Sequence, residues 1–510
     1  MAFNSASSVG LFALNVAITF FLSPIIIRQL GNRDYGIWEL LLSLSGYLGL
    51  VELGIPPAIV RFIGQSSALG NDQETRRTFW SSALAMLSAG LLSLIAMIAI
   101  SRNPDWIFGV SAQDRLALRP LCVLTGFNLL VTFSGCPAAS YFIARQEYYR
   151  LNILRATLSC ASGAATYVAL TRRPADGLIL LSLLMLAFNC VQYGVLWFWA
   201  LQGVELRNPS RADISARRIA ELAKFGISSF VLMLSDRIRG RSMPFVIGQT
   251  IGVAKIVYYS VPARLGAYGS GLLASIGAPF TPAFAAVEAT SGAAGLRHAL
   301  SHADHALRFV LIGISLGFGI VGSDFISIWI GRDYAENGKC VVAALAVGML
   351  VSAIAPNSGR LLVSMAKHGP IARQLLAVSV LTVLGSALVA RPLGLTGVAV
   401  ILAGGDVSGF LLTWRSACRS LKVSMAAQLR EVLKSSAIPA AGMALALASL
   451  RALLKPETYI ALAAVASVAS LVYALLWWFF AMKREEREAI AGGARRVAVR
   501  CKAWLGLVPR

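Results

Sequence analysis

The sequence predicts an all-α, polytopic integral membrane protein with about fourteen transmembrane helices. Of its 510 residues, 57% are hydrophobic and 14% are charged, whereas about 25% of residues are charged in typical soluble proteins. Apolar runs of roughly 20 residues, long enough to cross a hydrocarbon core about 30 Å thick, recur along the chain. These runs are apolar all round, which favours helices over the alternating strands of a membrane barrel.

Each expected span begins where an apolar run begins. The starting residues are Val9, Ile37, Phe79, Ala117, Ile153, Leu178, Phe225, Ile256, Leu307, Val341, Ile371, Leu393, Ala437 and Tyr459. Tryptophan prefers the membrane–water interface. Nine of the ten tryptophans lie near the ends of these spans, which supports the assignment.

A basic segment over residues 202–224 follows the sixth span and predicts the boundary between two lobes. The expected organisation is an N-terminal six-helix lobe over 1–201, this basic cytoplasmic linker, and a C-terminal six-helix lobe over 225–430. Two additional transmembrane helices over 431–482 and a basic cytoplasmic tail over 483–510 complete the chain. Repeated six-helix halves are typical of transporters.

The net charge of +22 comes from Lys and Arg in short segments between spans, not from a soluble basic face. Anionic lipid headgroups are therefore the expected partners, and nucleic acid is not. Placing both termini in the cytoplasm puts most of the basic residues on the cytoplasmic side, as the positive-inside rule requires. We expect a multi-pass protein of the cytoplasmic (inner) membrane.

The segment SDRIRGR, residues 235–241, interrupts the seventh expected span. On insertion scales an Arg or Asp at the centre of a span costs roughly 2.5–3.5 kcal/mol, so these side chains cannot all face lipid. Arg237, Arg239 and Arg241 are therefore candidates to line a hydrated cavity and bind an anion, with Asp236 paired to one of them. The alternative is an interfacial helix followed by a span over 243–261.

Further ionisable residues within apolar runs are functional candidates by default. Glu52 and Asp406, each close to glycine, are the better candidates for an ion-coupling carboxylate, and Arg264 is a candidate cavity residue. Asp324 and Arg360 could equally serve at a helix end or in a structural pair.

No metal or cofactor is expected. The seven cysteines are scattered and never form CxxC, which argues against a zinc site or a disulfide framework. His298, His302 and His305 follow one helical face, but no HExxH glutamate accompanies them, so an interfacial helix is the preferred interpretation. The chain also lacks GxxxxGK[ST] and a GxSxG triad.

Residues 9–64 resemble the polysaccharide, or O-antigen, flippases of the multidrug/oligosaccharidyl-lipid/polysaccharide exporter superfamily. The resemblance rests on LGxxxYGIW followed by SxxGYLxLxELGIPxAxxR. Its residues include Leu30, Gly31, Tyr35, Gly36, Trp38, Ser43, Tyr47, Leu53, Gly54 and Arg61. Glu52 stands where the family often has Asp. The segments SDR at 235–237 and IWIGRDY at 328–334 resemble features of the second lobe.

The resemblance implies a V-shaped pair of six-helix lobes with two extra helices, working by alternating access. Its cargo would be a polyprenyl-pyrophosphate-linked oligosaccharide, moved to the outer leaflet for surface polysaccharide such as the O-antigen of lipopolysaccharide, with glycan polymerase or export machinery as further partners. Arg237, Arg239, Arg241 and Arg264 would hold the head group, because guanidinium groups engage phosphate oxygens in pairs. The tyrosines expected to contact sugar are Tyr258, Tyr259 and Tyr268.

Three other functions stay open. A flippase of the peptidoglycan precursor would also have a cationic cavity. A drug/cation antiporter of the same superfamily would be expected to have an acidic one. A membrane-embedded glycosyltransferase or polymerase would need catalytic groups on a sizeable external segment, and the largest expected here, near residues 101–116, is short. The sequence therefore favours a transporter and not an enzyme.

Overall fold

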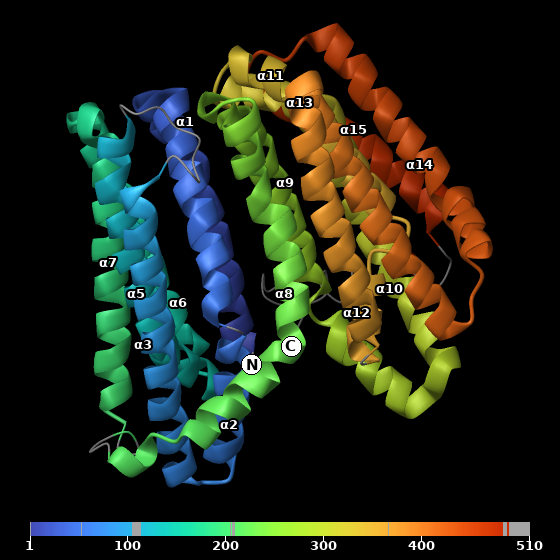
Figure 1. The fold of residues 1–510 in the computed structure, drawn as a ribbon. Helices are drawn as coiled ribbons and strands as arrows, with labels where there is room; N and C mark the ends of the chain where they lie inside the picture. Colours follow the sequence, from blue (N-terminus) through green and yellow to red (C-terminus); the bar gives the residue numbers. More distant parts are fainter. Residues whose placement is uncertain are drawn as a thin grey trace, which may run out of the picture. The chain divides into compact units, whose positions relative to one another are not determined.

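The structure, a computed structural model, describes residues 2–52, 54–104, 114–203, 206, 210–365, 367–482 and 487–488. Every regular element in these residues is a helix (Figure 1). The α-helices are α1 Ala2–Leu48, α2 Ile55–Ala68, α3 Asp72–Arg102, α5 Asp114–Ala144, α6 Tyr148–Arg172, α7 Gly177–Leu201, α8 Ala216–Thr250, α9 Ile256–Gly277, α10 Phe280–Trp329, α11 Arg332–Ser352, α12 Ser358–Ser364, α13 His368–Leu421, α14 Met425–Leu454 and α15 Tyr459–Leu476.

Ten helical stretches in the described chain are long and apolar enough to cross a membrane. Three of them, over 10–52, 253–329 and 369–421, are too long for one span, because even 43 residues of straight helix measure about 65 Å. Non-helical backbone at Gly31 and Gly394 divides the first and the third of these stretches. The second is divided after Gly277 and again at Gly292 of α10, where the piece over 280–291 is too short to cross a membrane. Together with α8, which is too charged to count among the ten, fourteen helical spans result, in agreement with the sequence prediction.

Large apolar side chains on these helices are exposed, as expected of surfaces that face lipid. Phe21 is 69% exposed, Leu381 67% and Ile460 84%. Large apolar surfaces that are exposed on a protein mark contact with other molecules or with a membrane. The exposed leucines and phenylalanines therefore support the assignment of a multi-pass membrane protein.

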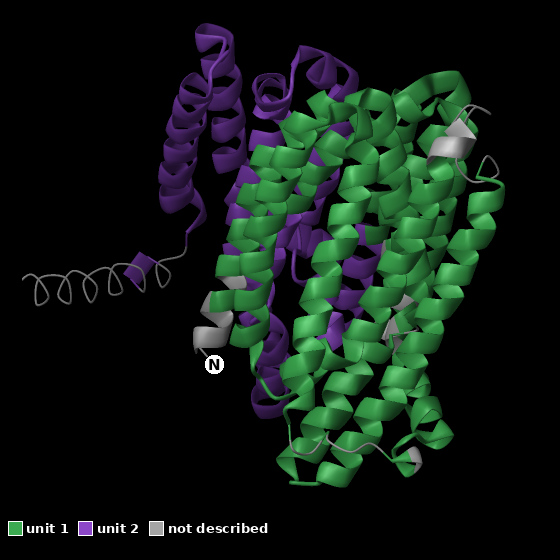
Figure 2. Ribbon diagram, turned by 90° about the vertical axis from the view of Figure 1, so that its left-hand side faces the viewer, with its two compact units in different colours: residues 1–268, 368–409 green, residues 269–367, 410–510 purple. Residues whose placement is uncertain are grey.

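The chain divides into two compact units (Figure 2). Unit 1 comprises residues 1–268 and 368–409, and unit 2 comprises residues 269–367 and 410–510. The helices α9 and α13 each continue from one unit into the other. The expected linker, residues 202–224, belongs to unit 1, and residues 216–224 form the first turns of α8. The expected tail over 483–510 lies outside the described residues except for 487–488.

Close helix packing in unit 1 depends on small residues. A Cβ atom added to Gly36 of α1 would lie 2.2 Å from the carbonyl oxygen of Val253, which belongs to the short 3-10 helix Val253–Lys255.

Aromatic side chains join three other helices of unit 1. The ring of Phe79 in α3 lies 5.2 Å from the Trp197 ring, centre to centre. The Trp197 indole donates to the carbonyl of Ser134 over 2.9 Å. These contacts bind α3, α5 and α7 into one bundle.

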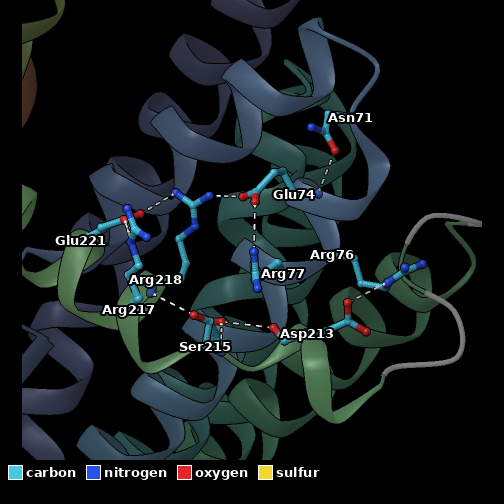
Figure 3. A network of polar contacts seen from close by, with 10 residues as sticks. Asn71, Glu74, Arg76, Arg77, Asp213, Ser215, Arg217, Arg218 and Glu221 are labelled. Atoms are coloured by element: carbon cyan, nitrogen blue, oxygen red, sulfur yellow. Dashed lines mark hydrogen bonds and ion pairs between the residues drawn. The ribbon is translucent and has the colours of Figure 1, made fainter.

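The segment before α8 is tied to the start of α3 by ion pairs (Figure 3). Arg218 of α8 pairs with Glu74 of α3, and Arg76 Nε lies 3.1 Å from the buried Asp213 carboxylate. Burial alone would raise the pKa of Asp213. The backbone amide of Ser210 and the Arg76 guanidinium outweigh that effect, and the pKa is lowered.

Unit 2 has a core of its own around α10, α14 and α15. The rings of Phe309 and Tyr473 are stacked with centres 5.0 Å apart, and the Tyr473 hydroxyl donates to the Phe309 carbonyl over 3.0 Å. Leu447, Val465 and Trp477 are almost fully buried beside them. The two C-terminal helices are thus packed onto α10.

Candidate functional site

The SDRIRGR segment lies inside one continuous helix, because α8 runs from Ala216 to Thr250. The alternative span over 243–261 is wrong: α8 ends at Thr250, Gly252 has φ 122°, and a short 3-10 helix precedes α9. Glycine suits this conformation because it has no Cβ atom. Arg237, Arg239 and Arg241 are therefore held by helical geometry at fixed angles around α8.

Arg237 and Arg241 are one turn apart on α8 and both contact α1. The Nη1 atom of Arg237 lies 3.5 Å from the carbonyl oxygen of Gly46. The Arg241 side chain packs on the same glycine, where a Cβ atom would lie 3.0 Å from Cγ of Arg241. In the described part of the chain, neither guanidinium is in an ion pair with a carboxylate. Gly46 thus leaves room for two half-buried cations.

Arg239 contacts a different helix. Its Nη1 atom lies 3.4 Å from Oδ1 of Asp406 on α13, with the two side chains 34% and 28% exposed. The predicted partner Asp236 has a side chain outside the described ones. Asp406, a predicted ion-coupling residue, is therefore in contact with one of the predicted anion-binding arginines.

Arg264 of α9 forms the tightest of these pairs. Its Nη2 atom lies 2.5 Å from Oε1 of Glu39 on α1, and the two side chains are 23% and 10% exposed. The same carboxylate oxygen accepts the Tyr35 hydroxyl over 2.8 Å, and the Arg264 guanidinium lies 5.9 Å from the Tyr35 ring centre. Tyr268, one turn further along α9, has a buried hydroxyl near Thr19 of α1.

Tyr259 lies close to both ion pairs, Arg239–Asp406 and Arg264–Glu39. Its side chain is only 7% exposed. Its phenol interacts electrostatically with Glu39, Asp406, Arg239 and Arg241. All of these residues belong to unit 1. We call this group the arginine cluster; its members are Arg237, Arg239, Arg241, Arg264, Glu39, Asp406 and Tyr259.

Glu52, the other predicted ion-coupling residue, lies in the 3-10 helix Gly49–Glu52 between α1 and α2 and is half-buried. The cation that acts on its carboxylate is Arg237. The sequence prediction that Glu52 couples transport to an ion stays a prediction. Glu52 therefore lies on the side of the arginine cluster where Arg237 contacts α1.

Several residues of the sequence pattern join α1 and α2 to α8. The Tyr47 hydroxyl is hydrogen-bonded to Ser242, and the Arg61 guanidinium lies 4.7 Å from the centre of the Phe225 ring. Gly54 has φ 70°, and a Cβ atom there would lie 2.7 Å from a backbone oxygen of α8. The pattern therefore specifies the surface against which the arginine-bearing helix packs.

Sequence reasoning missed Glu39. The signal that could have found it is the same one that selected Glu52: an acidic residue inside an apolar run, in IWELLL. It also stands four residues after Tyr35, which places both side chains on one helical face.

The three histidines do not converge on one point. The Nε2 atoms of His298 and His302 lie 3.3 Å apart on an exposed face, whereas the His305 ring packs on Trp477 with centres 5.0 Å apart. Among the described residues, no group of three or more His, Cys, Asp or Glu side chains could hold a metal ion.

Comparison with known proteins agrees with this architecture. The polysaccharide biosynthesis protein family matches residues 4–288. The fold is similar to that of the lipid II flippase MurJ in an inward closed conformation, with a TM-score of 0.72 at 12% identity over 94% of this chain and 99% of that one. An inward-facing multidrug resistance MATE family transporter of the MOP superfamily gives 0.63 at 11% identity, over 81% and 94%.

A curated relative matches over a shorter stretch. It is the uncharacterized membrane protein EpsK of Bacillus subtilis (strain 168), 24% identical over 147 residues. The match spans 28% of this chain and 28% of that relative. Because the family match covers more than half of the residues and the fold is that of the MOP superfamily transporters, the chain belongs to the polysaccharide biosynthesis protein family.

Proposed function

We propose that the protein is a flippase that moves a polyprenyl-pyrophosphate-linked oligosaccharide from the cytoplasmic to the outer leaflet by alternating access. The arginine cluster would bind the pyrophosphate, and the lipid chain would stay in the bilayer. In this proposal both termini are cytoplasmic, the membrane is the cytoplasmic one, and the product feeds a glycan polymerase or export system.

One observation carries the proposal: Arg237 and Arg241 are half-buried within α8 and form no ion pair in the described part of the chain. A membrane-embedded cation costs roughly 2.5–3.5 kcal/mol even on insertion scales, so such residues serve a ligand or a polar pathway. Planar guanidinium groups bind phosphate oxygens in pairs. Two such groups one helical turn apart suit a pyrophosphate.

The carboxylates suggest how transport is coupled to an ion. The Arg239–Asp406 contact is loose at 3.4 Å and both side chains are about one-third exposed. A cargo phosphate that engages Arg239 would release Asp406, which could then take up a proton or another cation. The Glu52 carboxylate interacts electrostatically with Arg237, which is on the other side of α8 from Arg239. A cargo phosphate that engages Arg237 would therefore affect Glu52 in the same way.

Two neighbouring functions differ in how well they suit the cluster. A peptidoglycan-precursor flippase is the stronger alternative, because the MurJ fold covers 94% of this chain and its cargo would present the same pyrophosphate. A drug/cation antiporter is disfavoured, since four arginines gather where a cationic drug would need acidic groups. No proposed step requires a catalytic residue.

Complementation of a deletion strain tests the function. We expect wild-type protein to restore surface polysaccharide, and Arg237→Ala or Arg241→Ala to lower it at least tenfold while lipid-linked repeat units accumulate inside the cell. Arg217→Ala is the matched control, because Arg217 lies on the same helix and is 91% exposed. Protein levels are compared by immunoblot.

Normal surface polysaccharide in the deletion strain, with loss of peptidoglycan synthesis instead, would favour the peptidoglycan-precursor alternative. Full activity of both arginine variants at wild-type protein level would refute the assignment of the pyrophosphate site to α8.

A further inference from the structure

A cavity of about 280 Å³ lies entirely within unit 2. It is lined mainly by α10, the last turns of α13 and the first turns of α14, and none of its lining residues belongs to the arginine cluster of unit 1. Its charged and aromatic lining comprises Arg297, Asp304, His305, Arg308, Trp414 and Glu431. A cavity of this volume would hold about nine water molecules. A small polar head group has a similar number of non-hydrogen atoms, so it would fit in this space.

Asp304 is the deepest acidic group in this lining, at 1% exposed. Its Oδ1 atom accepts from the backbone amide of Asn357 over 3.0 Å and from the Asn357 side chain over 3.1 Å. Its Oδ2 atom is buried and has no hydrogen-bond partner among the described residues. A buried acceptor without a donor is costly. The cavity therefore presents an acceptor that calls for an N–H or O–H donor.

Arg308 is already engaged and does not supply that donor. Its Nε and Nη2 atoms donate to the carbonyls of Ala353 and Ile354 over 3.2 and 3.0 Å. It thus holds the turn between α11 and α12. The Trp414 indole is likewise engaged, donating to Gln428 over 2.8 Å. Trp414 contributes an aromatic surface, which attracts ammonium groups.

The exposed end of the cavity carries charged residues. Arg297 and Glu431 line it and are exposed. Exposed basic residues surround this end of α13 and α14: Arg415, Arg419, Lys422, Arg430 and Lys434. Clusters of Lys and Arg beside a span are typical of the interface with anionic phosphates. Among the charged lining residues, Arg297 and Glu431 are exposed and Asp304 is buried, so a ligand would meet the Arg297 guanidinium nearer the surface and the Asp304 carboxylate deepest.

We propose that this cavity binds the head group of a phospholipid that carries a primary ammonium, as phosphoethanolamine does. The phosphate, which is nearer the acyl chains, would lie by Arg297, and the terminal ammonium would donate to Oδ2 of Asp304. A choline head group has no N–H and could not satisfy that oxygen. The site is independent of the cargo and of the arginine cluster.

Purified full-length protein in detergent, titrated with short-chain lipids and monitored by native mass spectrometry, tests the site. We expect dioctanoyl phosphatidylethanolamine to bind at least tenfold more tightly than dioctanoyl phosphatidylcholine. Asp304→Asn keeps the size and the acceptor for Asn357 but replaces the other oxygen with a donor, and should abolish the preference. Asp333→Asn, an exposed acidic residue of the same unit, is the control.

Wild-type protein supplies a second measurement if Asp304→Asn fails to fold. Glycerophosphoethanolamine should displace the lipid at high concentration, and glycerophosphocholine should not. Equal binding of the two lipids, or an unchanged preference in folded Asp304→Asn, would overturn the proposal. Glycerophosphoethanolamine binding as tightly as the lipid would assign the site to a soluble ligand instead.

Discussion

The Glu39–Arg264 pair should be one of the strongest polar interactions in unit 1, and a double-mutant cycle can measure it. At a charge separation of about 4 Å and an effective dielectric constant of about 20, the attraction is about 4 kcal/mol. Removing one partner leaves the other charge buried, which costs about 3–5 kcal/mol. We expect Glu39→Gln and Arg264→Gln each to destabilise by about that amount, because the side chains are only 10% and 23% exposed.

The double variant removes both charges and should be little worse than either single one. We expect a coupling energy of about 3 kcal/mol, measured by reversible unfolding in mixed micelles with increasing SDS. The control cycle uses Arg332 and Glu457, which lie 3.1 Å apart but are 78% and 75% exposed; about 0–1 kcal/mol is expected there. Coupling energies that are equal and small in the two cycles would refute the reasoning from burial.

Two further predictions concern packing and pH. Gly36→Ala should destabilise by about 1–3 kcal/mol in the same unfolding assay, since its Cβ atom would meet the Val253 carbonyl at 2.2 Å. A Cβ atom added at Gly240 would have nothing within 4 Å, so Gly240→Ala should instead stabilise α8 by up to about 1 kcal/mol. Equal changes in the free energy of unfolding for the two variants would show that the close approach at Gly36 does not decide the effect of an added methyl group. Because Asp213 has a lowered pKa in the folded state, it stabilises the protein above its unfolded pKa of about 3.9 and loses this effect as pH falls through the lower, folded pKa. The melting temperature of wild type should therefore exceed that of Asp213→Asn near neutral pH and converge with it in acid; a constant difference would contradict the role of Arg76.

The sequence by itself determined the fold class and the approximate number of spans, and it singled out the arginines that the structure places inside one long helix, α8. These properties follow from local patterns: apolar run length fixes a span, and i,i+4 spacing puts Arg237 and Arg241 on one face of α8. Resemblance over residues 9–64 identified the family, whose match extends over residues 4–288.

Only the tertiary structure decided which charges meet. Glu39 and Arg264 are 225 residues apart, and Arg239 and Asp406 are 167 apart. No spacing rule relates such residues, because the contact depends on how each helix is rotated and on which neighbours pack against it. For the same reason, the cavity of unit 2 and the Oδ2 atom of Asp304, which has no hydrogen-bond partner among the described residues, emerge only when distant helical segments of unit 2 come together.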